Sequence, residues 1–232
     1  MVRTFTMFKS ISNSLHSARL IVGFILLAHV VNAQDKPAFY EDIQRFKKQD
    51  SVQMPPPGQI LFIGSSSFTK WQNVQEDFPG YKIINRGFGG SSLPDLTRYV
   101  NDIVFPYKPK QIVIYCGDND LASSDKVTPD TVLERFRQLF ILIRSKLPRV
   151  SIAYVSIKPS PSRQQLMPKM LAANMLIREF LRKKTRTAYI DVYNKMLSNG
   201  EPIPDIFVED RLHMNEKGYA IWKAAIEPYL KK

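Results

Sequence analysis

Three consecutive serines, Ser65 to Ser67, follow a short apolar segment of the sequence. The four apolar residues Ile60–Ile63 are typical of a strand that is buried on both faces, and Gly64 permits a tight turn after it. Serines at such a junction commonly cap the next helix. A serine at the carboxyl end of a buried strand is also well placed to act as a nucleophile, because open α/β sheets bind ligands along that edge.

A serine nucleophile needs a base, and His213 is the residue that can supply one. The other two histidines, His16 and His29, lie in the first 33 residues, which we expect to be removed on export. The imidazole in turn needs a carboxylate that fixes its tautomer. Asp210 precedes His213 by three residues, so one turn of the chain can bring these two side chains together.

Acyl transfer also needs hydrogen-bond donors for the oxyanion, each worth about 3–4 kcal/mol at the transition state. Gly90 suits this role, since a residue without a side chain lets its backbone N–H approach a substrate. The side-chain amide of Asn119 is a second candidate, and the backbone N–H of the nucleophilic serine is a third. Taken alone, the glycine pair Gly89–Gly90 and the Gly117–Asp120 segment are each typical of ordinary turns.

These residues follow elements that alternate along the chain. Apolar runs predict strands at residues 60–63, 81–85, 111–116, 151–157 and 188–192. Helical spacing predicts helices at residues 38–50, 68–77, 94–105, 129–147, 168–184 and 215–230. This alternation indicates an α/β fold, a three-layer α/β/α sandwich with a five-stranded parallel sheet, and we expect the flavodoxin-like strand order 2-1-3-4-5. Because the loops after parallel strands share one edge, the candidate residues should converge there.

Four short motifs resemble the sequence blocks of the SGNH hydrolase superfamily, also called the GDSL lipases and esterases. Ile60–Phe68 resembles the first block, whose Gly-Asp-Ser turn carries the nucleophile, and Asn85–Gly90 resembles the second block. Gly117–Asp120 resembles the Gly-x-Asn-Asp block, and Asp210–His213 resembles the closing Asp-x-x-His block. The motifs occur in the family's order, and the resemblance covers nearly the whole predicted core.

The resemblance implies a role for each matched residue. Ser66 would be the nucleophile, His213 the general base, and Asp210 the carboxylate that orients the imidazole. The backbone N–H groups of Ser66 and Gly90, together with the side chain of Asn119, would form the oxyanion hole. The resemblance implies no metal and no organic cofactor.

The chain departs from the family pattern at Ser65, where an aspartate is usual. Ser65 and Ser67 are therefore alternative nucleophiles. The Gly-Ser-Ser-Ser turn, the following Trp71 and the later segment Lys158–Arg163 resemble an esterase-like branch of the superfamily. We expect substrate contacts from Ser65, Phe88, Lys158 and Arg163.

These features predict a serine ester hydrolase that cleaves small acyl or acetyl esters, including esters on carbohydrate, because no long apolar lid or tail-binding segment is visible in the sequence. A lipase, a lysophospholipase or a thioesterase of the same family would use the same residues, as would an acyltransferase that excludes water. The non-enzymatic alternative is a module that binds an anion at the serine-capped helix start. The expected partner is an ester of a small molecule, a carbohydrate or a lipid.

The composition limits other functions. The 232 residues are 44% hydrophobic, enough for one domain core, and they carry a formal net charge of +12. The basic residues are scattered and form no basic stripe interleaved with aromatic residues, so we do not expect nucleic-acid binding. Cys116 is the single cysteine, which excludes an intramolecular disulfide and a cysteine-based metal cluster.

Residues 1–33 have the pattern of an export signal. Basic residues precede the apolar run Leu20–Val31, which is short for a membrane span, and Ala33 suits a cleavage site. We expect a periplasmic or secreted protein without stable membrane insertion after cleavage, and an uncleaved membrane anchor is the alternative. Residues 34–57 would then form an N-terminal helix and a proline-rich lead-in, and residues 58–232 the hydrolase domain.

Overall fold

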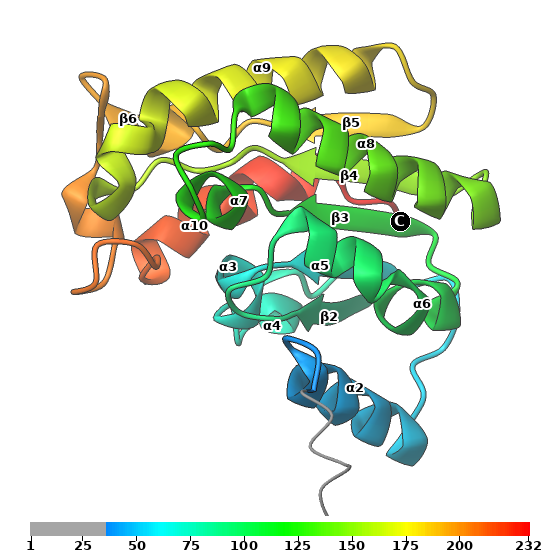
Figure 1. The fold of residues 1–232 in the computed structure, drawn as a ribbon. Coiled ribbons are helices and arrows are strands. Elements are labelled where there is room, and N and C mark those ends of the chain that lie inside the picture. The colour runs from blue at the N-terminus through cyan, green and yellow to red at the C-terminus, as the bar shows by residue number, and fades with distance from the viewer. Residues whose placement is uncertain (1–35) are drawn as a thin grey trace, which may run out of the picture. The chain divides into compact units, whose positions relative to one another are not determined.

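The computed structural model describes residues 36–232, so the predicted export signal lies outside the described residues and stays a prediction. Within the described range, five strands form one parallel sheet in the order β2-β1-β3-β4-β5 (Figure 1). These strands are β1 (Ile60–Gly64), β2 (Ile83–Gly87), β3 (Gln111–Tyr115), β4 (Ser151–Val155) and β5 (Thr187–Ile190). The predicted strand order is confirmed.

Helices pack on both faces of this sheet, as the predicted three-layer sandwich requires (Figure 1). One face carries α2 (Tyr40–Val52), α5 (Leu93–Arg98), α6 (Val100–Ile103), α8 (Pro129–Lys146) and α9 (Met167–Arg182). The other face carries α3 (Ser66–Thr69), α4 (Val74–Asp77) and α10 (Glu216–Ile226). Short 3-10 helices are η1 (Phe105–Tyr107), η2 (Pro161–Leu166), η3 (Asn194–Met196), η4 (Pro204–Ile206) and η5 (Glu227–Tyr229). No helix within residues 36–232 combines the length and the apolar character needed to cross a membrane.

The strands contribute alternate side chains to two hydrophobic cores, because successive residues of a strand point to opposite faces. In β1, Leu61 and Ile63 lie in the core beneath α5 and α8, whereas Ile60 and Phe62 lie in the core that contains Trp222 of α10. All five residues of β1 are buried. A strand covered on both faces is apolar at every position, which explains why the sequence predicts it clearly.

The register of the sheet aligns the ends of three strands. Gly64 of β1 is paired with Gly87 of β2 on one side and with Tyr115 of β3 on the other. The loops after these strands therefore leave the sheet side by side. The serine run, the Gly89–Gly90 pair and Asn119 lie directly after β1, β2 and β3 respectively.

Two predicted helices are each divided into shorter pieces. The predicted helix 68–77 consists of α3 and α4, separated by a turn in which Trp71 is 2% exposed and donates from its indole nitrogen to Asp77 (2.7 Å). The predicted helix 94–105 is divided into α5 and α6, because Tyr99 between them leaves the helical conformation (φ −99°, ψ 10°). Apolar spacing does not reveal such breaks, since the buried side chains of both pieces face the same core.

Two short elements have no counterpart in the sequence prediction. Helix α7 (Asp118–Ala122) forms where a loop was expected, and an antiparallel hairpin of β6 (Leu197–Ser198) and β7 (Glu201–Pro202) follows β5. The hairpin turn consists of Asn199 and Gly200, both with positive φ (53° and 83°). This dipeptide favours two-residue hairpin turns, so the signal for the hairpin was present in the sequence.

Candidate active site

Ser66 stands at the turn that follows β1. Gly64 has a φ of 147°, and a Cβ atom there would lie 1.9 Å from the carbonyl oxygen of Tyr115, so a residue with a side chain does not fit. Ser66 then begins α3. Helix α3 is anchored by Phe68, which is fully buried and packs edge-on against Trp222 with ring centroids 5.9 Å apart. The sharp turn and this anchor hold the Ser66 hydroxyl at the carboxyl edge of the sheet.

His213 lies on the loop before α10 and contacts Ser66 across the fold. Its Nε2 atom is 2.9 Å from Ser66 Oγ, and its Nδ1 atom is 2.5 Å from Asp210 Oδ2. The other carboxylate oxygen of Asp210 accepts from the backbone N–H groups of Leu212 (2.9 Å) and His213 (2.8 Å). Arg211, which follows Asp210, adopts a left-handed conformation (φ 57°), which tightens the turn from Asp210 to His213. These bonds link Ser66, His213 and Asp210 in one hydrogen-bonded chain.

The environment of Asp210 favours its charged form. Partial burial by itself would raise the pKa of this carboxyl, but hydrogen bonds from the His213 ring and from the backbone N–H groups of His213 and Leu212 outweigh it, so the pKa lies well below its ordinary value. An ionised Asp210 requires a proton on Nδ1 of His213. Nε2 is then free to accept a hydrogen bond, so the imidazole of His213 can take the proton of the Ser66 hydroxyl.

Ser91 connects the loops that carry the predicted oxyanion donors. It follows Gly90 in the chain and is fully buried. Its hydroxyl donates to the carbonyl oxygen of Gly64 (3.2 Å), and its own carbonyl accepts from Asn119 Nδ2 (3.0 Å). Gly90 and Asn119 are thereby brought to the serine turn. Ser91 is not predicted from the sequence, because one serine after a glycine pair carries no distinctive signal.

Three of the four predicted substrate contacts lie in the protein interior. Ser65 and Phe88 are fully buried, and Lys158 is 1% exposed. The fourth, Arg163, is partly exposed and forms an ion pair with Asp118 (3.1 Å). Ser65, Phe88 and Lys158 therefore pack behind the site and do not line its surface. Local sequence does not carry this distinction, because the packing of the surrounding layers decides which residues at a strand end are covered.

Lys158 supports the loop that carries His213. Its Nζ atom donates to the carbonyl oxygen of Leu212 (2.7 Å), and it lies 5.6 Å from the centre of the Phe207 ring. Burial lowers the pKa of Lys158 from 10.5 to about 8. A buried cation costs stability, so this contact is maintained against a desolvation penalty.

The titration of Lys158 predicts a pH-dependent stability. Between about pH 8 and 10.5 the unfolded chain holds a proton here that the folded protein has released, so folding stability rises with pH across this window. We expect a gain on the order of 2 kcal/mol, which Lys158→Met should remove. Denaturant unfolding of both proteins from pH 7 to 10.5 measures it, with the exposed Lys48→Met as control. A constant difference between wild type and Lys158→Met across the window would contradict the prediction.

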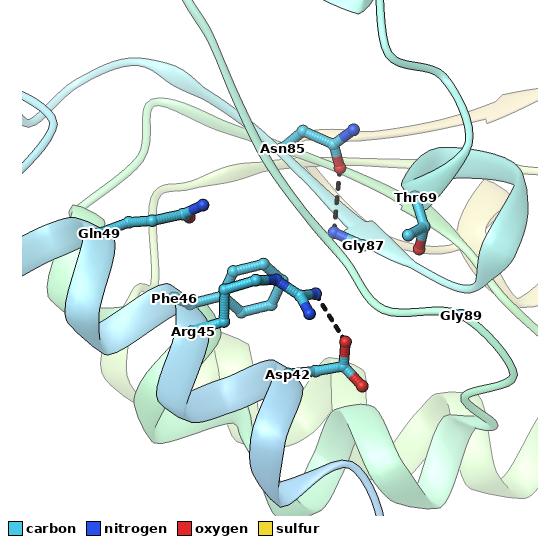
Figure 2. Close-up of a pocket in the computed structure, with 8 residues that line it drawn as sticks. All are labelled: Asp42, Arg45, Phe46, Gln49, Thr69, Asn85, Gly87 and Gly89. Carbon is cyan, nitrogen blue, oxygen red and sulfur yellow. Dashed lines mark hydrogen bonds and ion pairs between the residues drawn. The ribbon is translucent and has the colours of Figure 1, made fainter.

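A pocket of about 580 Å³ lies beside the serine turn. It is lined by Asp42, Arg45, Phe46, Gln49, Thr69, Asn85, Gly87 and Gly89. Figure 2 shows Asp42 and Arg45 of α2 on one side of this pocket, and Asn85 and Thr69 on the other. A Cβ atom on Gly89 would lie 3.7 Å from Ser66 Cβ, so this lining residue of the pocket is a direct neighbour of Ser66.

Helix α2, which supplies one wall of this pocket, is held to the sheet by a buried polar cluster. Asp50 forms an ion pair with Arg86 of β2 (2.5 Å), and both also hydrogen-bond the hydroxyl of Tyr107 (2.5 and 2.6 Å). Burial, together with the Asp50 hydrogen bond, raises the pKa of Tyr107 to about 12. Arg86 therefore helps to hold α2 in place through its bonds to Asp50 and Tyr107.

Comparison with known proteins places the chain in a family. The model of the GDSL-like lipase/acylhydrolase family matches residues 62–221. Among curated proteins, no sequence matches this chain significantly. Several solved structures share its fold at low sequence identity. One is a Bacteroides fragilis protein described as an acylhydrolase, with 20% identity, a TM-score of 0.71, and coverage of 82% of this chain and 96% of that chain.

Two further structures have the same fold. A GDSL-like lipase from Bacteroides thetaiotaomicron has 18% identity and a TM-score of 0.69, covering 81% of this chain and 96% of its own. A catalytic serine-to-alanine mutant of an acetylxylan esterase from Geobacillus stearothermophilus has 18% identity and a TM-score of 0.58, covering 75% of this chain and 94% of its own. The family match includes Ser66 and His213 and spans well over half of the 232 residues. The chain therefore belongs to the GDSL-like lipase/acylhydrolase family of the SGNH hydrolase superfamily, and it is a carboxylic ester hydrolase.

Proposed function

We propose that this protein is a serine esterase that cleaves small acyl esters, acetyl esters in particular, through a triad of Ser66, His213 and Asp210. One observation carries the proposal: the hydrogen bonds run without interruption from Ser66 Oγ through the imidazole of His213 to the carboxylate of Asp210 (2.9 and 2.5 Å). This is the arrangement that activates a serine hydroxyl, which is otherwise a weak nucleophile at neutral pH.

In the first step, Ser66 Oγ attacks the acyl carbon while His213 Nε2 accepts the hydroxyl proton. The carbonyl oxygen becomes an oxyanion, which accepts hydrogen bonds from the backbone N–H groups of Ser66 and Gly90 and from the Asn119 amide. The tetrahedral intermediate collapses to an acyl-enzyme, and His213 gives its proton to the leaving alcohol. His213 then activates a water molecule, which attacks the acyl-enzyme and releases the acid. Asp210 stays ionised throughout and stabilises the imidazolium.

The surroundings of Ser66 support a polar alcohol as the leaving group. The pocket beside Gly89 is lined mainly by charged and amide side chains, which can hydrogen-bond the hydroxyl groups of a sugar. Solved structures with the same fold include esterases named for acetylxylan and acetyl-xylooligosaccharides, which supports acetylated carbohydrate as a substrate class.

The substrate proposal is tested by comparing acetylated xylooligosaccharides with p-nitrophenyl esters from two to twelve acyl carbons. We expect acetate release from the oligosaccharide, and kcat/KM values that fall as the acyl chain lengthens. Gln49→Ala, which removes an amide from the pocket wall, should raise KM for the oligosaccharide several-fold and leave p-nitrophenyl acetate unaffected. Lys48→Ala, an exposed neighbour on α2 outside the pocket lining, is the control. Faster hydrolysis of the longest acyl chains would favour a lipase instead.

A further inference from the structure

Arg163 contacts the side chain of Asn119 from the segment that follows β4. Its Nη2 atom donates to Asn119 Oδ1 (2.9 Å), and its Nη1 atom lies 3.1 Å from Asp118 Oδ2. The arginine side chain is 18% exposed and that of Asp118 is 6% exposed. One planar guanidinium group thus holds the first two residues of α7, the short helix after β3.

The contacts of Asn119 determine which way its amide faces. A guanidinium group can only donate, so the atom facing Arg163 must be the amide oxygen. The carbonyl of Ser91 can only accept, so the atom facing it must be the amide nitrogen, at 3.0 Å. Two partners of opposite character therefore exclude the flipped amide. The nitrogen carries two hydrogens, and the Ser91 bond uses one of them, which leaves the second for a substrate oxygen.

Arg163 is itself fixed by the loop that carries His213. The backbone N–H of Ser162 donates to the carbonyl oxygen of Arg211 (3.1 Å), and the N–H of Arg163 donates to that of Ser160 (3.1 Å). The segment from Ser160 to Arg163 therefore links the loop of the base to the loop of the oxyanion donor. A shift of either loop would change the geometry of the other.

We propose that Arg163 is a positioning residue, which holds the Asn119 amide with its nitrogen available to the oxyanion. The proposal rests on the proposed function, because it assigns Arg163 an effect that is exerted through a donor of that reaction. Without the guanidinium, only the Ser91 carbonyl fixes the amide, and rotation away from that carbonyl can present the amide oxygen to the developing negative charge, which opposes the reaction. The effect should appear in kcat more than in KM, because the oxyanion forms only in the transition state.

The test is a double-mutant cycle between Arg163→Lys and Asn119→Ala, with kcat and KM measured on p-nitrophenyl acetate. Lysine keeps a cation for Asp118, which protects folding, but it lacks the fork that reaches both residues. We expect Arg163→Lys to lower kcat about 10- to 100-fold with KM changed less than about threefold, and Asn119→Ala to lower kcat about 10²- to 10³-fold. In the Asn119→Ala background, Arg163→Lys should have almost no further effect, because the group through which it acts is gone.

The matched control is Arg135→Lys. Arg135 pairs with Asp120 (2.8 Å), the other neighbour of Asn119 in α7, but has no hydrogen bond to the Asn119 amide. We expect its kcat to stay within about threefold of wild type. Equal losses in both backgrounds of the cycle, or an equal loss in Arg135→Lys, would show that Arg163 acts by general loop stabilisation and would overturn the proposal.

The failure of this inference can be distinguished from the failure of the proposed function. If Asn119→Ala keeps full activity while Ser66→Ala is inactive, the triad stands and the role of Arg163 is refuted. If the wild-type protein neither hydrolyses p-nitrophenyl acetate nor reacts with a fluorophosphonate, the proposed function itself is refuted, and this inference with it. Thermal unfolding of each variant confirms that the measured protein is folded.

Discussion

Replacing Ser66 with alanine is expected to lower kcat on p-nitrophenyl acetate by about 10⁴- to 10⁶-fold, as is usual when the nucleophile of a serine hydrolase triad is removed. The two other serines of the run cannot substitute for it. Ser65 is fully buried and Ser67 is 3% exposed, whereas the Ser66 hydroxyl lies 2.9 Å from the imidazole of His213. We expect the free energy of unfolding to change by less than about 0.5 kcal/mol, because Ser66 is only partly buried.

Labelling with a fluorophosphonate, mapped by peptide mass, provides the independent measurement. The adduct should lie on Ser66 and be absent from Ser66→Ala. Ser65→Ala and Ser67→Ala serve as matched controls and should stay active and labelled, since these are the alternative nucleophiles in the same turn. An adduct on either of those serines, or full activity in Ser66→Ala, would refute the assignment.

Replacing Asp210 with asparagine is expected to lower kcat by about 10⁴-fold, although the two side chains have almost the same shape. In the wild type, one oxygen of Asp210 accepts from two backbone N–H groups and the other faces His213 Nδ1. The asparagine oxygen would keep the backbone bonds, so its NH₂ group would face Nδ1. His213 would then carry its proton on Nε2 and donate to Ser66, and it could no longer accept the serine proton.

The pH dependence of this pair follows from the low pKa of Asp210. The hydrogen bonds from His213 and Leu212 keep the folded pKa below the ordinary value of 3.8. The bonds therefore stabilise the folded protein fully above the unfolded pKa, and this contribution is lost as the pH falls through the folded value. We expect stability at acid pH to fall less steeply in Asp210→Asn than in the wild type, as measured by denaturant unfolding from pH 7 to 2.

The adjacent, exposed Glu209 offers the control for this prediction. Glu209→Gln makes the same chemical change one residue away and should leave kcat within about threefold of wild type. The assignment would fail if Asp210→Asn kept more than about a tenth of the wild-type kcat, or if Glu209→Gln lost as much activity.

Several parts of the fold could be predicted from sequence because their cause is local. Strand β1 is apolar at each position from Ile60 to Ile63 since both of its faces are covered, and apolar content is visible in any sequence. The turn at Gly64 was also predictable. The close approach to Tyr115 admits no side chain there, so the sequence must show a glycine, and a glycine after an apolar run indicates a turn. The breaks in the predicted helices 68–77 and 94–105 were not, because they depend on side chains such as Trp71 that turn into a core built from distant segments.

Burial was the main property that the sequence did not reveal at the site. Lys158 and Phe88 were expected to contact the substrate, yet both side chains are buried. The same limitation concealed Ser91 and the contact between Arg163 and Asn119, which joins residues 44 positions apart. No local pattern records such contacts, because the partner is chosen by the way the loops pack.

The two hydrogen bonds of the proposed triad differ in how far they can be predicted from the sequence alone. The pairing of Asp210 with His213 was predictable from their spacing alone, because three residues of chain place both side chains within reach in a single turn. The contact between His213 and Ser66 spans 147 residues, and chain connectivity does not bring them together. Tertiary packing decides it: the parallel sheet places the serine turn at one edge, and Lys158 after β4 holds the loop of His213 there through the carbonyl of Leu212.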